Sequence, residues 1–157
     1  MDGTVNECRR LDRAEAIKYL NALIGKPVKY IIKSPDMNLY DFGFGDTFAV
    51  EGALGLHRMC EYTMHTSSSA IRVFWDNEEE SEYSGNTSSK EVSLLSERLM
   101  NSIVKSVALN DKNDLCIDFE ICRMVVVTFE DAEESWRVFH VDVDRPHLVA
   151  ADSWICL

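Results

Sequence analysis

The sequence predicts an α+β protein that forms one domain over residues 1–157, in which a mostly antiparallel, strongly bent sheet of about seven or eight strands is covered by two amphipathic helices. Apolar and polar residues alternate through residues 114–143, which is the period-two pattern of half-buried antiparallel strands. Two other segments, after Asp12 and after Ser88, repeat apolar residues at helical spacing. A length of 157 residues suits one domain, and neither a repeat nor a linker divides the chain.

The first expected helix follows a capping box, Asp12-Arg13-Ala14-Glu15, with Asp in place of Ser. Gly25 and Pro27 end it, because glycine favours the turn after a last helical residue and proline cannot continue a helix. Residues 28–33 and 37–42 then predict a hairpin of two strands. The apolar stripe of the helix consists of Ile17, Leu20, Leu23 and Ile24.

Residues 43–46, Gly-Phe-Gly-Asp, resemble part of a glycine-rich phosphate loop. The third glycine, the Lys-Ser/Thr pair and a following helix pattern are all missing, so we expect a tight connection between strands instead. Residues 48–66 predict a long or bulged strand, and residues 70–75 predict a further one. Residues 76–89 are acidic, rich in Ser and Asn, and apolar only at Tyr83, so we expect a mobile surface loop.

A second capping box, from Ser88 to Glu91, predicts a helix that closes at Asn110-Asp111. Its apolar residues at helical spacing are Val92, Leu95, Leu99, Ile103 and Val107. Residues 114–143 then predict a meander of three antiparallel strands, and residues 147–156 predict the last strand. In the first strand of the meander we expect one face to hold Leu115, Ile117, Phe119 and Ile121, and the other to hold Cys116, Asp118, Glu120 and Cys122.

The charge balance disfavours nucleic acid as a partner. Lys and Arg number 16 against 27 Asp and Glu, which gives a formal charge of −11. A chain of this charge repels phosphate backbones unless it has a local basic patch, and no basic run exceeds Arg9-Arg10. A basic protein partner is compatible with this charge, although excess acid also serves solubility.

The sequence predicts a cytoplasmic protein with reduced thiols. No apolar run approaches the roughly 20 residues that span a bilayer, and the charged N-terminus does not resemble a secretory signal. The cysteines are odd in number and lack Cys-x-x-Cys spacing. They are Cys8, Cys60, Cys116, Cys122 and Cys156. On one continuous strand Cys116 and Cys122 would lie about 20 Å apart, far beyond the reach of a disulfide.

No catalytic or metal-binding constellation is recognisable. His57, Cys60 and His65 lie close in sequence, yet on a strand they point to different faces or lie too far apart to share a metal ion. A Cys60 nucleophile with His140 or His147 as base is conceivable, but a buried cysteine is normally inert. No Gly-x-Ser-x-Gly motif occurs. We expect no cofactor and no metal, and a non-enzymatic role is favoured over an enzyme.

Three roles are compatible with these patterns. In the first, the protein is a non-enzymatic binding protein that docks a basic partner through its acidic surface, with Glu78, Glu79, Glu80 and Glu82 as candidate contacts. In the alternative, it binds a small molecule or is an enzyme, with a pocket on the concave face of the sheet. The candidate residues of that pocket are His57, Cys60, Trp136 and His140. A structural subunit of a larger assembly is a third possibility.

Several segments together resemble a group of small uncharacterised bacterial proteins, some encoded beside toxin genes and treated as immunity-like. The segments are Leu23-Ile24-Gly25-Lys26-Pro27-Val28, Phe42-Gly43-Phe44-Gly45, Leu56-His57-Arg58-Met59-Cys60, Glu134-Ser135-Trp136-Arg137-Val138-Phe139 and Pro146-His147-Leu148-Val149. One departs from the pattern, because Cys60 is followed by Glu61-Tyr62-Thr63 instead of a Pro-Trp-Arg-like segment. The resemblance implies a bacterial cytosolic α+β protein of unassigned activity and carries over no catalytic residues, and it adds toxin neutralisation to the roles expected of a binding protein.

Overall fold

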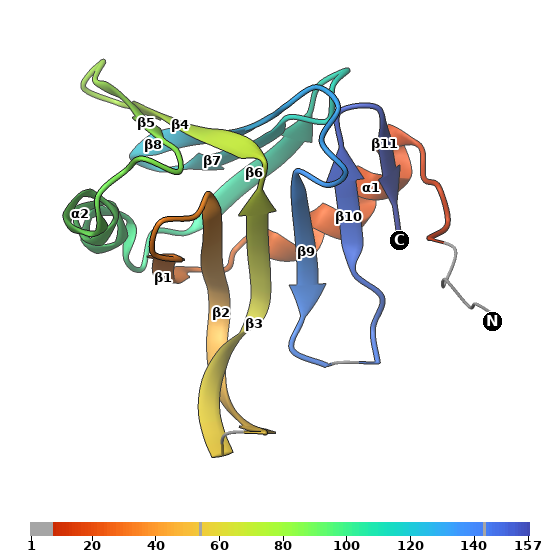
Figure 1. Ribbon diagram of the computed structural model, residues 1–157, viewed down its shortest axis with the longest axis horizontal. Helices are drawn as coiled ribbons and strands as arrows, with labels where there is room; N and C mark the ends of the chain where they lie inside the picture. The colour runs from red at the N-terminus through yellow and green to blue at the C-terminus, as the bar shows by residue number, and fades with distance from the viewer. Residues whose placement is uncertain (1–7, 54, 143) are drawn as a thin grey trace.

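The computed structural model describes residues 8–53, 55–142 and 144–157 (Figure 1). Within these residues the chain forms two α-helices, one short 3₁₀ helix and eleven strands. In chain order they are α1 (Arg13–Leu20), η1 (Asn21–Leu23), β1 (Val28–Lys33), β2 (Leu39–Gly52), β3 (Gly55–Ser67), β4 (Ser69–Trp75), β5 (Glu80–Tyr83), α2 (Ser89–Leu99), β6 (Val104–Leu109), β7 (Leu115–Phe119), β8 (Cys122–Thr128), β9 (Trp136–His140), β10 (Leu148–Ala151) and β11 (Trp154–Cys156).

The described strands form two antiparallel sheets. The six-stranded sheet has the order β1-β2-β3-β9-β10-β11, and the five-stranded sheet has the order β5-β4-β8-β7-β6. The predicted α+β class and antiparallel pairing are confirmed, whereas a single bent sheet of about seven or eight strands is wrong. In place of a bend within one sheet, the chain passes from one sheet to the other at Ser68. This residue, with φ of 44°, is the only one between β3 and β4.

The core lies between the inner faces of the two sheets. In the six-stranded sheet the register aligns Phe42, Met64, Val138 and Leu148, which are all fully buried. The five-stranded sheet contributes alternate residues of β4, β7 and β8, as the period-two pattern predicts. These include Ile71, Val73, Leu115, Ile117, Met124 and Val126, all with 0% exposure.

The two helices close the sides of this core instead of covering a sheet. Helix α1 packs against β6 and β11, and α2 lies along β1, where the backbone N of Ile31 donates to Ser96 Oγ at 3.1 Å. Figure 1 shows α2 at one side of the molecule and α1 behind β9 and β10. The expectation that the helices cover a sheet face is therefore wrong, and within the described residues the outer faces of both sheets are open.

Both predicted helix starts are confirmed, but the second helix is much shorter than expected. Asp12 Oδ1 accepts from the backbone N of Glu15 at 2.8 Å, and Ser88 Oγ accepts from the backbone N of Glu91 at 3.2 Å. Helix α2 ends at Leu99, and the expected continuation to Asn110 is wrong because residues 104–109 form β6. Residues 25–28 form backbone hydrogen bonds with residues 101–104, after α2. This long-range pairing overrides the helical spacing of Ile103 and Val107.

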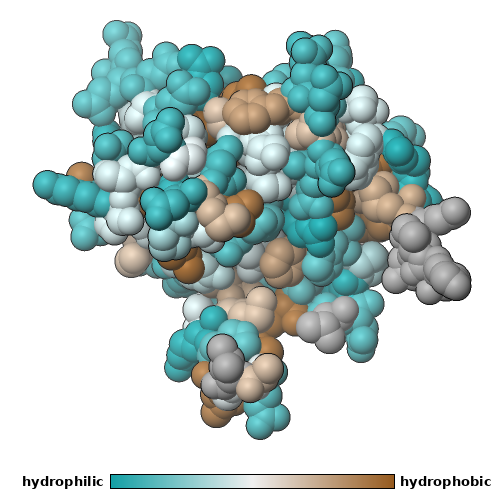
Figure 2. Space-filling model, viewed as in Figure 1, coloured by the Kyte–Doolittle hydropathy of each residue, from teal (hydrophilic) through white to brown (hydrophobic). Residues whose placement is uncertain are grey.

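Residues 43–46 do not connect two strands, so that expectation is wrong. They lie inside β2, where the pairing with β3 shifts between Phe44 and Thr47 and Gly45 has φ of 88°. The turn of this hairpin falls instead between β2 and β3, inside the segment expected to be one strand, and Leu54 lies outside the described residues. The far end of the hairpin projects below the body with hydrophobic and hydrophilic side chains exposed (Figure 2).

The acidic segment and the meander also differ from expectation. Residues 80–83 of the expected loop form β5, which pairs with β4 and buries Tyr83. Strands β7 and β8 are neighbours as predicted, but β9 pairs with β3 and β10 in the other sheet. The expected last strand is a hairpin of β10 and β11. Val143, at the end of the expected meander, lies outside the described residues.

One disulfide corrects the prediction that all thiols are reduced. Cys8 and Cys156 are bonded across a sequence separation of 148 residues, beside the pairing of residues 9–11 with β11. Cys60, Cys116 and Cys122 are free, so Cys116 and Cys122 do not pair, as predicted. The expected reason is wrong, because they lie on two strands, β7 and β8, and not on one continuous strand. Among the described residues, no helix is long and apolar enough to cross a membrane.

Candidate functional site

The outer face of the five-stranded sheet carries two rows of side chains that run across all five strands. These positions point outward because their neighbours along β4, β7 and β8 are buried in the core. The first row consists of Ala108, Cys116, Val125, Arg72 and Glu82. The second row consists of Ser106, Asp118, Arg123, Phe74 and Glu80.

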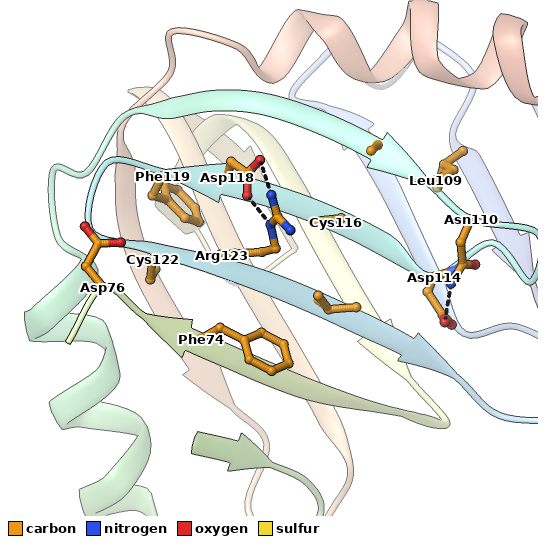
Figure 3. A pocket seen from close by; sticks show the side chains of 12 residues that line it. Phe74, Asp76, Leu109, Asn110, Asp114, Cys116, Asp118, Phe119, Cys122 and Arg123 are labelled. Carbon is orange, nitrogen blue, oxygen red and sulfur yellow. Dashed lines mark hydrogen bonds and ion pairs between the residues drawn. The ribbon is translucent and has the colours of Figure 1, made fainter. Parts of the chain in front are cut away.

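Small side chains hollow this face over β6, β7 and β8. Ala108, Cys116 and Val125 form an apolar floor. The larger side chains of Phe74 and Arg123 also line the hollow (Figure 3). The hollow has a volume of about 740 Å³. Figure 3 shows Asp76 near one end of the hollow and Asp114 near the other. The floor therefore offers apolar contact between two acidic ends.

An ion pair of the second row lies beside the floor. Arg123 Nε donates to Asp118 Oδ1 at 2.6 Å, and Ser106 Oγ donates to Asp118 Oδ2 at 3.0 Å. The Arg123 guanidinium is the main cause that holds the pKa of Asp118 below its usual range, and the Ser106 hydroxyl adds to it. Asp118 is thus ionised and already neutralised within the protein.

The two cysteines that line the hollow are poor nucleophiles. Burial raises the pKa of the Cys116 thiol, and it raises the pKa of Cys122 to about 12. Because the thiolate is the reactive form, both side chains stay protonated and unreactive near neutral pH. The hollow is therefore suited to apolar contact and charge pairing.

The four predicted glutamates lie at the β5 end of this face, and two of them are neutralised. Glu80 pairs with Arg72, and Glu79 pairs with Arg98 at 3.1 Å. Arg98 in turn lies 3.6 Å from the centre of the Trp75 ring, so it is held from two sides. Within the described part of the chain, no ion pair is found for Asp76, which lines the hollow, for Glu82 on β5, or for Glu78 and Glu120 in the turns before β5 and after β7.

The residues of the alternative pocket are not brought together. His57 is exposed near the turn of the β2–β3 hairpin, whereas Cys60 is fully buried and burial raises its pKa. Trp136 is a core residue whose Nε1 donates to the backbone O of Asn113 at 2.9 Å. His140 Nδ1 accepts from the backbone N of Asp142 at 2.9 Å. None of the four lines the hollow described above.

The outer face of the six-stranded sheet holds a polar chain that was not predicted. Asp41, His65 and Arg137 lie side by side on β2, β3 and β9. His65 Nδ1 is 2.7 Å from Asp41 Oδ1, and this hydrogen bond raises the pKa of His65. Arg137 binds both carboxylate oxygens of Glu134, at 2.9 Å from Nε and at 2.5 Å from Nη2. Asp41 with His65, and Glu134 with Arg137, therefore satisfy each other within the protein.

The chain of contacts continues to His147, next to a second hollow. Arg137 Nη1 lies 2.9 Å from His147 Nδ1, which must accept because a guanidinium only donates. Burial, and then the charge of Arg137, lower the pKa of His147, and its ring stacks on Phe139 at 4.6 Å. The second hollow, of about 670 Å³, is also lined by Arg145, Asp144, Trp154 and the Cys8–Cys156 disulfide.

Sequence patterns could not reveal either group of residues. Cys116 and Asp118 were expected on the outward face, but Ala108, Val125 and Arg123 join them only through the register of β6 and β8. The same holds for Asp41, His65 and Arg137, which lie far apart in sequence. Among the residues that the structure describes, no group of three or more His, Cys, Asp or Glu side chains could hold a metal ion.

Comparisons of the chain with protein-family models, curated proteins and solved structures gave no match. The class of this protein is therefore defined by its fold and site: an α+β protein with two antiparallel sheets, in which the outer face of the five-stranded sheet is open and hollowed and has carboxylates at both ends of the hollow. The likeness to immunity-like bacterial proteins stays a prediction.

Proposed function

We propose that this protein is a non-enzymatic binding protein that captures a basic protein partner on the outer face of its five-stranded sheet. The observation that carries the proposal is the apolar floor of Ala108, Cys116 and Val125 between acidic ends. Burying such a floor stabilises a complex, and unpaired carboxylates around it select a cationic partner. The immunity-like resemblance makes a cationic toxin the first partner to consider.

Electrostatics support the proposal in two ways. The net charge of −11 attracts a basic partner over a long range and speeds its encounter. Close to the surface, Asp76, Glu78, Glu82 and Glu120 supply charge that the described residues do not neutralise. The Asp118–Arg123 pair offers a place where an incoming Lys or Arg can bind Asp118 in competition with Arg123.

The proposal is tested by affinity capture from a lysate of cells that express the protein naturally. The bait is the wild-type chain or one of two variants, each of which removes four negative charges. The first variant changes the site: Asp76→Asn, Glu78→Gln, Glu82→Gln and Glu120→Gln. The matched control changes exposed carboxylates elsewhere: Asp36→Asn, Asp46→Asn, Glu51→Gln and Glu133→Gln.

We expect the wild-type chain and the control to enrich the same protein of pI above about 9, and the site variant to associate with it about tenfold more slowly at low salt. The difference should shrink as the ionic strength rises towards 0.3 M, at roughly 6 Å Debye length. Failure to enrich any basic protein, or an equal loss in the control, overturns the proposal, because net charge alone would then explain the binding.

A further inference from the structure

We infer that the partner presents an amphipathic, basic α-helix that lies across the five strands of this sheet, with its N-terminus over β5. This inference rests on the proposed function and adds the shape and orientation of the docking element. It follows from the edges of the five-stranded sheet, from the spacing of its strands, and from the distribution of its charges.

Strand addition is disfavoured because both edges of the five-stranded sheet are protected. At β6 the backbone of Val104 already bonds to the segment before β1: Gly25 N donates to Val104 O at 2.9 Å, and Val104 N donates to Lys26 O at 3.0 Å. Helix α1 and η1 also pack against β6. The other edge, β5, has only four residues. Among the described residues, neither edge of this sheet offers a partner strand a long free segment. The partner is therefore expected to bind the face of the sheet.

The pitch of an α-helix matches the spacing of the strands on this face. Neighbouring strands lie about 4.8 Å apart, close to the 5.4 Å pitch of an α-helix. Successive turns of a helix perpendicular to the strands therefore meet successive strands. Five strands span about 19 Å, which a helix covers with about 13 residues at 1.5 Å per residue.

The two cross-strand rows assign a role to each side of such a helix. Apolar side chains at i, i+4 and i+7 would rest on the row of Ala108, Cys116 and Val125. Lys or Arg on the two flanks would face Asp76 at one end of the hollow and Asp114 at the other (Figure 3). The hollow thus complements a narrow apolar stripe with cations on both sides.

The charges also orient the helix. Glu82 at the β5 end of the first row and Glu78 in the turn before β5 have no ion pair among the described residues, whereas Lys105 is exposed on β6. A helix carries partial positive charge at its N-terminus and partial negative charge at its C-terminus. The N-terminus is therefore stabilised over β5 and the C-terminus over β6.

The test uses two fluorescein-labelled, 14-residue peptides with the same number of Leu and Lys residues, measured by fluorescence anisotropy with the full chain. In one peptide the Leu residues follow helical spacing, and in the other Leu and Lys alternate as in a strand. We expect the helical peptide to bind at least tenfold more tightly and to gain helical circular dichroism. Equal binding of the alternating peptide overturns the helix inference and leaves the proposed function standing.

A variant that fills the hollow locates the binding. Ala108→Trp places a large ring on the exposed floor without touching the core, and it should weaken helical-peptide binding by tenfold or more. The matched control, Ile32→Trp, changes a residue of the six-stranded sheet that is already 57% exposed, and it should leave binding unchanged. Binding that ignores Ala108→Trp, or no binding at all, overturns the inference, whereas the lysate capture decides the proposed function independently.

A photo-crosslinker at either end of the helical peptide tests the orientation. With the crosslinker at the N-terminus, mass spectrometry should find adducts in residues 78–83, and with the crosslinker at the C-terminus it should find them in residues 104–109. The reverse pattern contradicts the orientation argued from the helix dipole.

Discussion

The outer faces of the two sheets differ in how their charges are used. On the six-stranded sheet, Asp41 binds His65, and Arg137 joins Glu134 to His147. On the five-stranded sheet, the ion pairs of Arg123 and Arg72 leave an apolar floor open, and the carboxylates of Asp76, Glu78, Glu82 and Glu120 have no ion-pair partner among the described residues.

This difference explains why only one face is proposed as a docking surface. A partner that binds the six-stranded face must replace hydrogen bonds between half-buried groups, which costs about as much as it returns. A partner that binds the five-stranded face covers apolar surface and neutralises carboxylates that are otherwise solvated. The same fold therefore ties up the charges of one row of side chains and leaves an apolar floor uncovered on the other face.

The largest effect that separates the two roles should come from the disulfide beside the six-stranded face. Cys8→Ser opens a link across 148 residues, and the chain-entropy view predicts a loss in the free energy of unfolding of up to about 5 kcal/mol. Urea denaturation measures this loss, with Cys116→Ser as the control. Helical-peptide binding at the five-stranded face should not change, and an unaltered urea midpoint contradicts the prediction.

The next effect concerns the polar chain itself. Glu134→Gln removes the carboxylate that binds Arg137 twice, so the free energy of unfolding should fall by about 2 kcal/mol. The neighbouring, exposed Glu133→Gln should change it by less than about 0.5 kcal/mol, as surface substitutions usually do. Equal effects from the two variants would show that the polar chain does not contribute to stability.

The two histidines of this face should shift the pH dependence of stability in opposite directions. The pKa of His65 is raised by Asp41, so its stabilisation is complete below about 6.5 and is lost as the pH rises through the higher folded value. The pKa of His147 is lowered by burial, so its stabilisation is complete above about 6.5 and is lost as the pH falls from there through the lower folded value.

His65→Gln and His147→Gln test this sign difference by denaturation between pH 5 and pH 8. Relative to the wild-type chain, His65→Gln should be least stable near pH 5, because the charged His65 is then missing. His147→Gln should be least stable near pH 8 and should approach the wild type near pH 5. Parallel profiles for the two variants would contradict the opposite shifts.

The smallest effect on stability should come from the ion pair on the five-stranded face. Arg123→Gln breaks an exposed, solvent-screened pair, so the free energy of unfolding should change little. Binding of the basic helical peptide should tighten a few-fold, because Asp118 is then available to its cations. Anisotropy titration measures this, and weaker binding would show that Arg123 supports the partner instead of competing with it.

Local patterns predicted local structure well in this chain. The capping boxes at Asp12 and Ser88 were correct, because a cap depends on residues within one helical turn. The alternation Leu115, Ile117, Phe119 was correct for burial, although Ile121 is exposed and Cys122 is buried where the turn into β8 interrupts the period. The four-residue spacing of Ile103 and Val107 wrongly predicted that the second helix continues, because a spacing of four residues fits one face of a strand as well as one face of a helix.

By itself the sequence determined the α+β class, the antiparallel pairing, the helix starts and the acidic charge, because each depends on composition or on neighbours a few residues apart. Only the tertiary structure decided that there are two sheets, that β9 leaves the meander, and that Cys8 meets Cys156. It also decided that Ala108, Cys116 and Val125 share one open floor. These features depend on register between distant strands, which short-range patterns do not encode.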